Sequence, residues 1–338
     1  IVAGAPPWTQ TGYEMLNANW PARINTRSDG TLILPLSKMP IVHRAVMNKC
    51  DGLDGLKDGV LQNPLACPFK AAELVCKDGN GKDCLTSEQA DVLQKIYDGP
   101  FDGTDGPRYY LGQGGLALGS ELKWRDLGPF VGDRDSMTKY FGTYHPRGPQ
   151  FDDRTVDPQE ELVDMGLNEW IFSPMNPDLR NFKAAGGKLI LFHGWDDGVP
   201  MPPSIAYYET ATRLMGGESK TKDFFRFYAL AGMDQCRGGV GGGEVDWIGA
   251  IENWVERGQA PEALIAYHFD NYITSPRADA DYGAPYLRTA RFPLTRDEYD
   301  RAHPIYPYPD TPRYSGRGDP ADPATWTRVK GKMTYLTD

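Results

Sequence analysis

The feature that most constrains the fold is a regular alternation of apolar runs and amphipathic stretches late in the chain. Residues 188–194 (KLILFHG) form a short, continuous apolar run bounded by glycines, which is typical of a parallel strand buried on both faces. An amphipathic stretch at 203–216, a second apolar run at 224–230 and a second amphipathic stretch at 244–258 follow it. Strand, helix, strand and helix in this order predict a doubly wound α/β domain.

The rest of the chain has a different character. Residues 1–8 open with IVAGAP, which reads as the end of a buried strand, so we expect the chain to start inside a fold. Residues 9–175 are irregular and rich in Gly, Pro, Trp and Tyr. Within them, the stretch 86–99 predicts a helix, because it starts with a Thr/Ser cap and ends at Gly. The Pro- and Tyr-rich tail after residue 270 is expected to wrap the surface.

Charge and hydropathy argue against two classes of partner. The chain has 36 Lys and Arg against 46 Asp and Glu, a formal net charge of -10. This balance disfavours non-specific binding to nucleic acid and to anionic membranes. No apolar run approaches the roughly 20 residues that span a bilayer. We therefore expect neither a nucleic-acid partner nor a membrane partner.

Cysteine usage indicates an oxidising compartment, secreted or periplasmic. Cys50, Cys67, Cys76 and Cys84 cluster in one loop-rich stretch, and Cys236 stands alone. The cluster has no CxxC pair, so two local disulfides are favoured over a zinc site, and spacing leaves their pairing open. Cys236 is then either free or paired with a cysteine outside this sequence. Together with the strand-like opening, it leads us to expect a missing N-terminal segment.

The loop at 50–60 (CDGLDGLKDGV) contains three closely spaced carboxylates. Asp51, Asp54 and Asp58 are hard oxygen ligands, and the glycines between them permit sharp turns. This chemistry suits Ca²⁺, which takes six to eight oxygens in proteins. The spacing is not that of an EF-hand, however, and a solvated acidic turn is the alternative interpretation.

Polar residues follow the first predicted strand directly. Asp196 and Asp197 come at its carboxyl end, which in a parallel sheet faces the crevice where ligands bind. Asp197 is a candidate for a carboxylate that orients a catalytic His. Asp196 is the other candidate for that role. The alternative interpretation is that both aspartates only cap a helix or stabilise a turn. His193 reads as a packed, hydrogen-bonded histidine rather than a base.

A serine nucleophile is not evident. The sequence contains no G-x-S-x-G elbow, and none of the other histidines has a convincing acidic partner. The Gly-rich loop after the second strand (231–243) holds a Cys but no His. The sequence as given therefore cannot by itself run an acyl-transfer triad.

Several segments taken in order resemble the tannase/feruloyl esterase family of secreted α/β-hydrolases, which includes the mono(hydroxyethyl) terephthalate hydrolase type. The segments are IVAGAP, CDGLDGLKDGV, KLILFHGWDDG, WVERGQAPEALIA and YPYPDTPRYSGRGDP, and the resemblance spans nearly the whole chain. It implies the C-terminal part of an α/β-hydrolase doubly wound sheet with a large irregular lid insertion. Residues 1–8 would end a core strand, 9–175 form the lid with a calcium loop, and 176–338 complete this part of the core.

The resemblance also implies roles for individual residues. The family's calcium ligands match three carboxylates and two backbone carbonyls, those of Asp51, Asp54, Asp58, Leu56 and Val60. Its disulfides match Cys50–Cys67 and Cys76–Cys84. Asp197 matches the triad acid, and Cys236 matches the cysteine that bridges to one beside an upstream Ser. The implied substrates are esters of aromatic acids, of the gallate, hydroxycinnamate or terephthalate kind.

Departures from the family pattern are as informative. The family loop reads G-M-x-H-C, and here Gln235 stands in the place of the catalytic His. An amide cannot accept the serine proton near neutral pH, so general-base catalysis is lost unless a neighbour such as Asp234 substitutes. Tyr306 occupies one expected cysteine position. The alternatives to an esterase are an inactive, calcium-stabilised binding protein and an enzyme with different chemistry in the same pocket.

The resemblance directs attention to the lid for substrate contacts. Aromatic residues in 123–144 are candidates to pack on the substrate ring. Arg125 or Arg134 is a candidate to hold a carboxylate.

Overall fold

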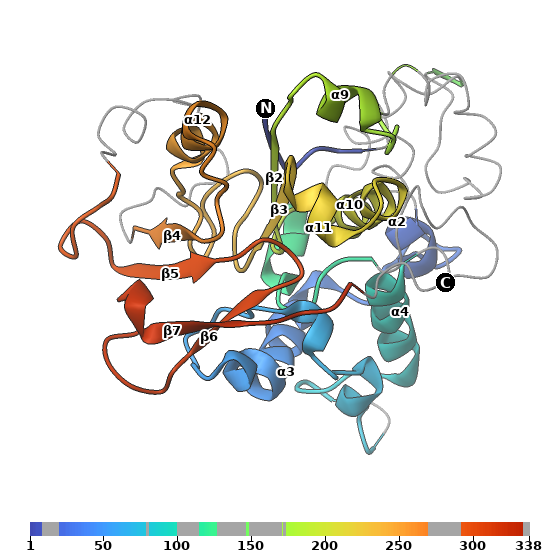
Figure 1. Cartoon of the computed structure of the whole chain (residues 1–338). Coiled ribbons are helices and arrows are strands. Elements are labelled where there is room, and N and C mark those ends of the chain that lie inside the picture. The colour runs from blue at the N-terminus through green and yellow to red at the C-terminus, as the bar shows by residue number, and fades with distance from the viewer. Residues whose placement is uncertain are drawn as a thin grey trace.

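The residues that the computed structural model describes are 1–8, 20–78, 81–99, 115–126, 147–148, 171, 174–269 and 292–333. At the centre lies a sheet of three parallel strands, β1 (Val2–Gly4), β2 (Leu189–Gly194) and β3 (Phe225–Leu230), in the spatial order β1-β2-β3 (Figure 1). Both strands predicted from the apolar runs are confirmed, and the opening residues pair as a third strand beside them.

Helices cover both faces of this sheet. Because successive strand residues point to opposite faces, Leu191 and Phe225 pack with α10 (Pro202–Leu214). Ile190 and Tyr228 pack with α12 (Trp247–Arg257) on the other face. Figure 1 shows α10 and α12 on either side of β2 and β3. The doubly wound arrangement predicted from the sequence is therefore present, with the short helix α11 (Glu218–Lys222) between α10 and β3.

The helix predicted at 244–258 starts later than expected. The side chain of Asp246 accepts a hydrogen bond from the Gly249 amide, so Asp246 is the N-cap and α12 begins at Trp247. Residues 244–245 do not join the helix, since Glu244 forms an isolated antiparallel bridge to Tyr267.

The chain between β1 and β2 (residues 5–188) forms a second apolar core of its own. Val42, Val46, Leu85, Leu93 and Trp124 are among its buried members. Within the described residues, this connection contains the helices α2 (Trp20–Asn25), α3 (Met39–Cys50), α4 (Ser87–Asp98) and α9 (Arg180–Ala184). None of the helices in the described ranges combines the length and apolar character needed to cross a membrane.

Local sequence signals place α4 and the cross-links correctly. Thr86 and Gln89 form the reciprocal capping box, and the helix predicted at 86–99 is confirmed. The sulfur atoms of Cys50 and Cys67 are bonded at 1.90 Å and those of Cys76 and Cys84 at 1.99 Å. Local disulfides are therefore the correct interpretation of the cysteine cluster, and Cys236 is free.

The C-terminal tail does more than wrap the surface. β4 (Leu264–His268) pairs antiparallel with β5 (Arg301–Ile305), and β6 (Thr311–Tyr314) pairs with β7 (Trp326–Val329). The Tyr308 amide donates to the Phe227 carbonyl at 2.7 Å, so the chain after β5 runs beside β3. Sequence reasoning missed these strands because all four are short, and because prolines in β5 and β6 weaken the period-two pattern.

His303 on β5 makes stability sensitive to acid. Burial, and next the charge of Arg301, lower its pKa to about 4, and its Nε2 atom has no hydrogen-bond partner in the described part of the chain. In the unfolded chain the ring binds a proton below about pH 6.5. The free energy of unfolding is therefore expected to fall between pH 6.5 and pH 4, by about 3 kcal/mol from this group.

This expectation is checked by thermal unfolding of wild type and His303→Leu at pH 7 and pH 4.5. The variant should lose less stability on acidification than wild type, because other titrating groups contribute equally to both proteins. An equal loss in the two proteins would remove His303 as the cause.

Candidate active site

Three strand ends and the loops that follow them converge at the carboxyl edge of the sheet. The Trp195 amide donates to the Leu230 carbonyl at 2.9 Å, and the Asp196 amide donates to the Met233 carbonyl at 3.1 Å. The loop after β2 is thus hydrogen-bonded to the loop after β3. Gly194 makes this approach possible, because a Cβ there would lie 2.0 Å from the Met233 carbonyl oxygen.

Asp197 is buried where these two loops meet, and only one of its two carboxylate oxygens accepts a hydrogen bond from the described residues. Its Oδ1 accepts a hydrogen bond from the Val199 amide at 2.8 Å. Its Oδ2 is buried and has no hydrogen-bond donor among the described residues. A carboxylate with one oxygen fixed and the other free can receive a hydrogen bond from a further group.

The Asp197 carboxylate lies near the loop that carries Gln235. Burial raises the pKa of the Cys236 thiol, and the negative charge of Asp197 raises it further. Asp234 also has a raised pKa, mainly from burial and in part from Asp197. The residues on both sides of Gln235 therefore feel the Asp197 charge. The Gln235 side chain itself is exposed.

Cys236 ties this loop to the end of β1. Its backbone adopts φ 63°, which is uncommon for a residue other than Gly. Its Sγ lies 3.6 Å from the carbonyl oxygen of Gly4, the last residue of β1. The exposed thiol is therefore positioned at the carboxyl end of the first strand.

His193 is packed rather than available as a base. Its side chain is fully buried at the end of β2. Nδ1 lies 2.7 Å from Ser204 Oγ, and Nε2 lies 2.8 Å from the Val199 carbonyl oxygen. The expectation of a hydrogen-bonded core histidine is confirmed.

Asp196 and Asp234 form an acidic pair next to Asp197. Burial, and then the charges of Asp234 and Glu121, raise the pKa of Asp196 to about 7. Lys123 Nζ approaches Asp234 Oδ2 at 2.9 Å, while Asp234 Oδ1 is buried without a hydrogen bond. Asp234 is thus held toward the β1–β2 connection by Lys123.

A buried glutamate organises the same side of the site. Glu121 Oε1 accepts hydrogen bonds from the Tyr97 hydroxyl at 2.7 Å and from the Gly119 amide at 2.9 Å. Its Oε2 lies 2.9 Å from His43 Nδ1. Burial lowers the pKa of His43, but the hydrogen bond and charge of Glu121 outweigh it and raise the pKa overall. Sequence reasoning missed this group, because its members lie far apart in the chain.

The acidic loop at 50–60 is only partly prepared for a cation. Asp51 accepts from the Asp58 and Gly59 amides, and Asp54 Oδ1 accepts from the Leu56 amide at 3.0 Å. Asp54 Oδ2 is buried without a hydrogen bond, and Asp58 Oδ2 lies 3.5 Å from Arg301.

The pKa of Asp54 reflects this crowding. Burial, followed by the charges of Asp58 and Asp51, raises it to about 7. An oxygen without a donor among three repelling carboxylates fits the chemistry of a calcium ligand set. In the part of the chain that is described, though, no three acidic, His or Cys side chains meet as a metal site.

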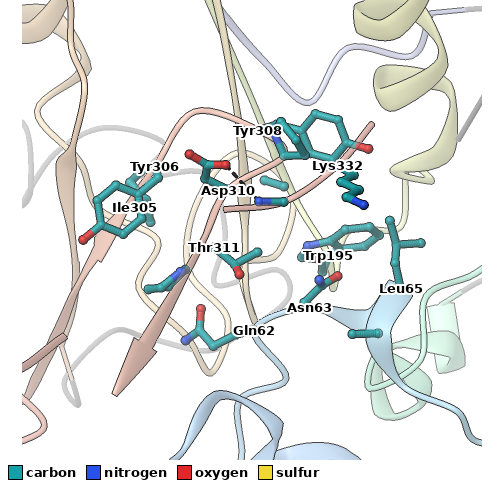
Figure 2. Close-up of a pocket in the computed structure, with 15 residues that line it drawn as sticks. Gln62, Asn63, Leu65, Trp195, Ile305, Tyr306, Tyr308, Asp310, Thr311 and Lys332 are labelled. Carbon is teal, nitrogen blue, oxygen red and sulfur yellow. Dashed lines mark hydrogen bonds between the residues drawn. The ribbon is translucent and has the colours of Figure 1, made fainter. Parts of the chain in front are cut away.

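A separate cavity of about 260 Å³ lies next to Trp195. Figure 2 shows it between Gln62 and Asn63 from the β1–β2 connection and Tyr308 and Lys332 from the C-terminal region. Its lining includes neither Asp197 nor Gln235. Trp195, which directly precedes Asp196, is the structural link between this cavity and the convergent loops.

The expectation that aromatic residues of the stretch 123–144 pack on a substrate ring is wrong for Trp124, which is buried in the second apolar core and donates from Nε1 to Ser120 Oγ. Of the stretch 123–144, residues 127–144 lie outside the described residues, and this range includes Arg134. The side chain of Arg125 is also outside them. The assignment of substrate contacts to these residues stays a prediction.

Comparison with known proteins gives consistent matches. A family model described as tannase and feruloyl esterase matches residues 1–329. A probable feruloyl esterase B-2 of Neosartorya fischeri is 26% identical over 349 aligned positions, which cover 97% of this chain. Among solved structures, an esterase from Aspergillus oryzae superposes with a TM-score of 0.78 at 24% identity over 97% of this chain. Feruloyl esterase B from the same organism superposes with a TM-score of 0.74 at 22% identity, also over 97%.

The matched proteins are longer than this chain. The alignment covers 61% of the Neosartorya fischeri protein and 63% of each Aspergillus oryzae chain. The structural matches establish that the fold is that of these esterases.

Proposed function

This chain belongs to the tannase and feruloyl esterase family, and we propose from this premise that it forms the acid and base loops of a carboxylic ester hydrolase. The observation that carries the proposal is the state of Asp197. It is buried, Val199 fixes its Oδ1, and its Oδ2 lacks a donor beside the loop that carries residue 235. A triad acid needs this arrangement, because its free oxygen accepts the ring N–H of the catalytic base.

The proposed mechanism assigns the remaining roles by position. A Ser outside this sequence attacks the ester carbonyl, the residue at 235 takes its proton, and backbone amides beside the Ser hold the oxyanion. Asp197 orients the base. With Gln235 at the base position, the general-base step is missing, a loss that typically costs on the order of 10⁴–10⁶ in kcat.

The proposed substrates are esters of aromatic carboxylic acids. Support comes from the names of the matched proteins, which include feruloyl esterases. The alternative is a binding protein that keeps the pocket and has lost catalysis. Gln235 is the observation that favours this alternative.

We further propose a structural calcium ion and an extracellular or periplasmic location. The ion would be held by the carboxylates of Asp51, Asp54 and Asp58 with the carbonyls of Leu56 and Val60, and the unpaired Asp54 Oδ2 supports this. The two disulfides support an oxidising compartment. In the complete protein, Cys236 is proposed to pair with a cysteine beside the upstream Ser.

The function is tested with the complete protein, including the nucleophile segment, on methyl ferulate, methyl gallate and mono(2-hydroxyethyl) terephthalate. Butyl acetate serves as the aliphatic control. We expect slow hydrolysis of an aromatic ester that exceeds hydrolysis of butyl acetate and rises in Gln235→His. Aromatic ester binding by calorimetry, with no hydrolysis even after Gln235→His, would establish the binding protein instead.

A further inference from the structure

A directed chain of hydrogen bonds lies beneath the Asp197 loop. Trp8 Nε1 donates to Ser204 Oγ at 2.7 Å, Ser204 Oγ lies 2.7 Å from His193 Nδ1, and His193 Nε2 lies 2.8 Å from the Val199 carbonyl oxygen. Ser204 and His193 are completely buried. The chain joins the segment after β1, the start of α10 and the end of β2.

The chemistry of the partners fixes the protonation of His193. The Val199 carbonyl can only accept, so Nε2 must carry a hydrogen. The Trp8 indole can only donate, so it occupies one of the two lone pairs of Ser204 Oγ. Among the described residues, His193 Nδ1 is the acceptor within reach of the hydroxyl hydrogen. This arrangement assigns the ring hydrogen to Nε2 and makes Nδ1 the acceptor of the Ser204 hydroxyl.

This tautomer determines how Asp197 is held. The Val199 carbonyl receives the His193 hydrogen bond while the Val199 amide donates to Asp197 Oδ1 at 2.8 Å. His193 Nε2 lies 3.4 Å from Asp197 Oδ2, but its hydrogen is directed at Val199. Val199 therefore links His193 to Asp197 and fixes the turn at 197–199. Asp197 Oδ2 has no hydrogen-bond donor among the described residues.

We propose that His193 is a positioning residue for Asp197, which through the Val199 carbonyl fixes the carboxylate so that its Oδ2 is presented to residue 235. This proposal rests on the proposed function in one respect, which is that Asp197 orients the catalytic base. Trp8 also takes part in this arrangement. Its ring stacks on that of Tyr207, with the ring centroids 3.9 Å apart and an interplanar angle of 17°, and this contact fixes the start of the β1–β2 connection against α10.

The first test reads the tautomer directly. Nitrogen-15 long-range NMR of the 338-residue chain, with the His193 signal assigned from His193→Gln, should show a hydrogen on Nε2 and none on Nδ1. Ser204→Ala should change the Nδ1 shift. A hydrogen on Nδ1, or a charged ring at neutral pH, would overturn the proposal.

The second test uses a matched pair of variants. The Gln side-chain nitrogen in His193→Gln can reach the place of Nε2 and keep the bond to Val199, whereas the shorter amide of His193→Asn can replace only Nδ1. The readout is the pH profile of Cys236 alkylation by iodoacetamide in the 338-residue chain, where the thiol is free. Asp197 lies close enough to raise the pKa of this thiol. Asp197→Asn calibrates the effect and should raise the alkylation rate near neutral pH, because removing the Asp197 charge lowers the thiol pKa.

We expect the alkylation rate of His193→Asn to differ from that of wild type and to lie between the wild-type and Asp197→Asn rates. His193→Gln should alkylate at the wild-type rate, and both variants should melt at similar temperatures. If both variants lose thermal stability equally and neither changes the Cys236 profile, His193 only fills the core and the proposal fails. These readouts do not require ester hydrolysis, so they separate this proposal from the proposed function.

A third readout applies to the complete protein with Gln235→His. There His193→Asn should lower kcat at least tenfold with little change in KM, and His193→Gln should retain most of the activity. Equal losses in both variants would contradict the positioning role.

Discussion

Gln235→His is expected to raise kcat for aromatic ester hydrolysis by at least about 10³-fold in the protein that also carries the nucleophile segment. The reason is geometric as well as chemical. The loop after β3 is already hydrogen-bonded to the loop after β2, and Asp197 Oδ2 is buried beside it without a donor. A ring at position 235 would give that oxygen its partner and would provide the missing proton acceptor. Steady-state kinetics on methyl ferulate and methyl gallate measure the change.

The control for this gain is the double variant Gln235→His/Asp197→Asn. It should lose most of the restored activity, because the base is then without its orienting carboxylate. Gln235→Asn should behave like wild type.

Asp234 is the alternative candidate for the base. Its test looks for a loss of activity on substitution, whereas the Gln235→His test looks for a gain. If wild type hydrolyses aromatic esters rapidly and Asp234→Asn abolishes that activity, Asp234 takes the proton and the role of residue 235 is wrong. The structure disfavours this outcome, since Lys123 holds Asp234 Oδ2 at 2.9 Å toward the β1–β2 connection.

The sequence predicted the parts of the fold that local patterns determine. The apolar runs that became β2 and β3 are short, and the first is continuous and bounded by glycines, so their burial could be predicted from the sequence. The Thr86 cap gave the start of α4. β5 and β6 contain prolines and pair only in tertiary context, and no local pattern distinguished them from an irregular tail.

In the candidate site, too, local sequence predicted some features, and others depend on contacts between distant segments. Asp197 could be predicted because a carboxylate directly after a buried parallel strand has to lie at the carboxyl edge of the sheet. The Lys123–Asp234 pair could not, since it joins residues 111 apart in the chain. The contact between Glu121 and His43, 78 residues apart, was hidden for the same reason. Side-chain pairs between distant segments follow from how the segments dock, which residue spacing does not encode.

Calcium is expected to raise the melting temperature of wild type by roughly 5 °C at concentrations far above its Kd, and Asp54→Asn should abolish this effect. Asp54 is the best residue for this test. Its Oδ2 is buried and has no hydrogen-bond donor among the described residues, and the negative charges of Asp51 and Asp58 lie close to it. Thermal unfolding with calcium and with EDTA measures the difference. Asp91→Asn on the exposed face of α4 is the matched control and should respond to calcium like wild type.

The same variant has an opposite effect when calcium is removed. Burial, with the neighbouring carboxylates, raises the Asp54 pKa from 3.8 to about 7 in the folded protein, so the folded state binds the proton more tightly than the unfolded chain. The free energy of unfolding in EDTA should therefore fall as pH rises from about 4 to 7, by up to about 4 kcal/mol from this group. Asp54→Asn should not show this fall and should be more stable than wild type at pH 8 in EDTA, yet less stable than wild type in calcium. If calcium leaves the wild-type melting temperature unchanged, the loop is a solvated acidic turn. A calcium effect that survives in Asp54→Asn would place the ion elsewhere.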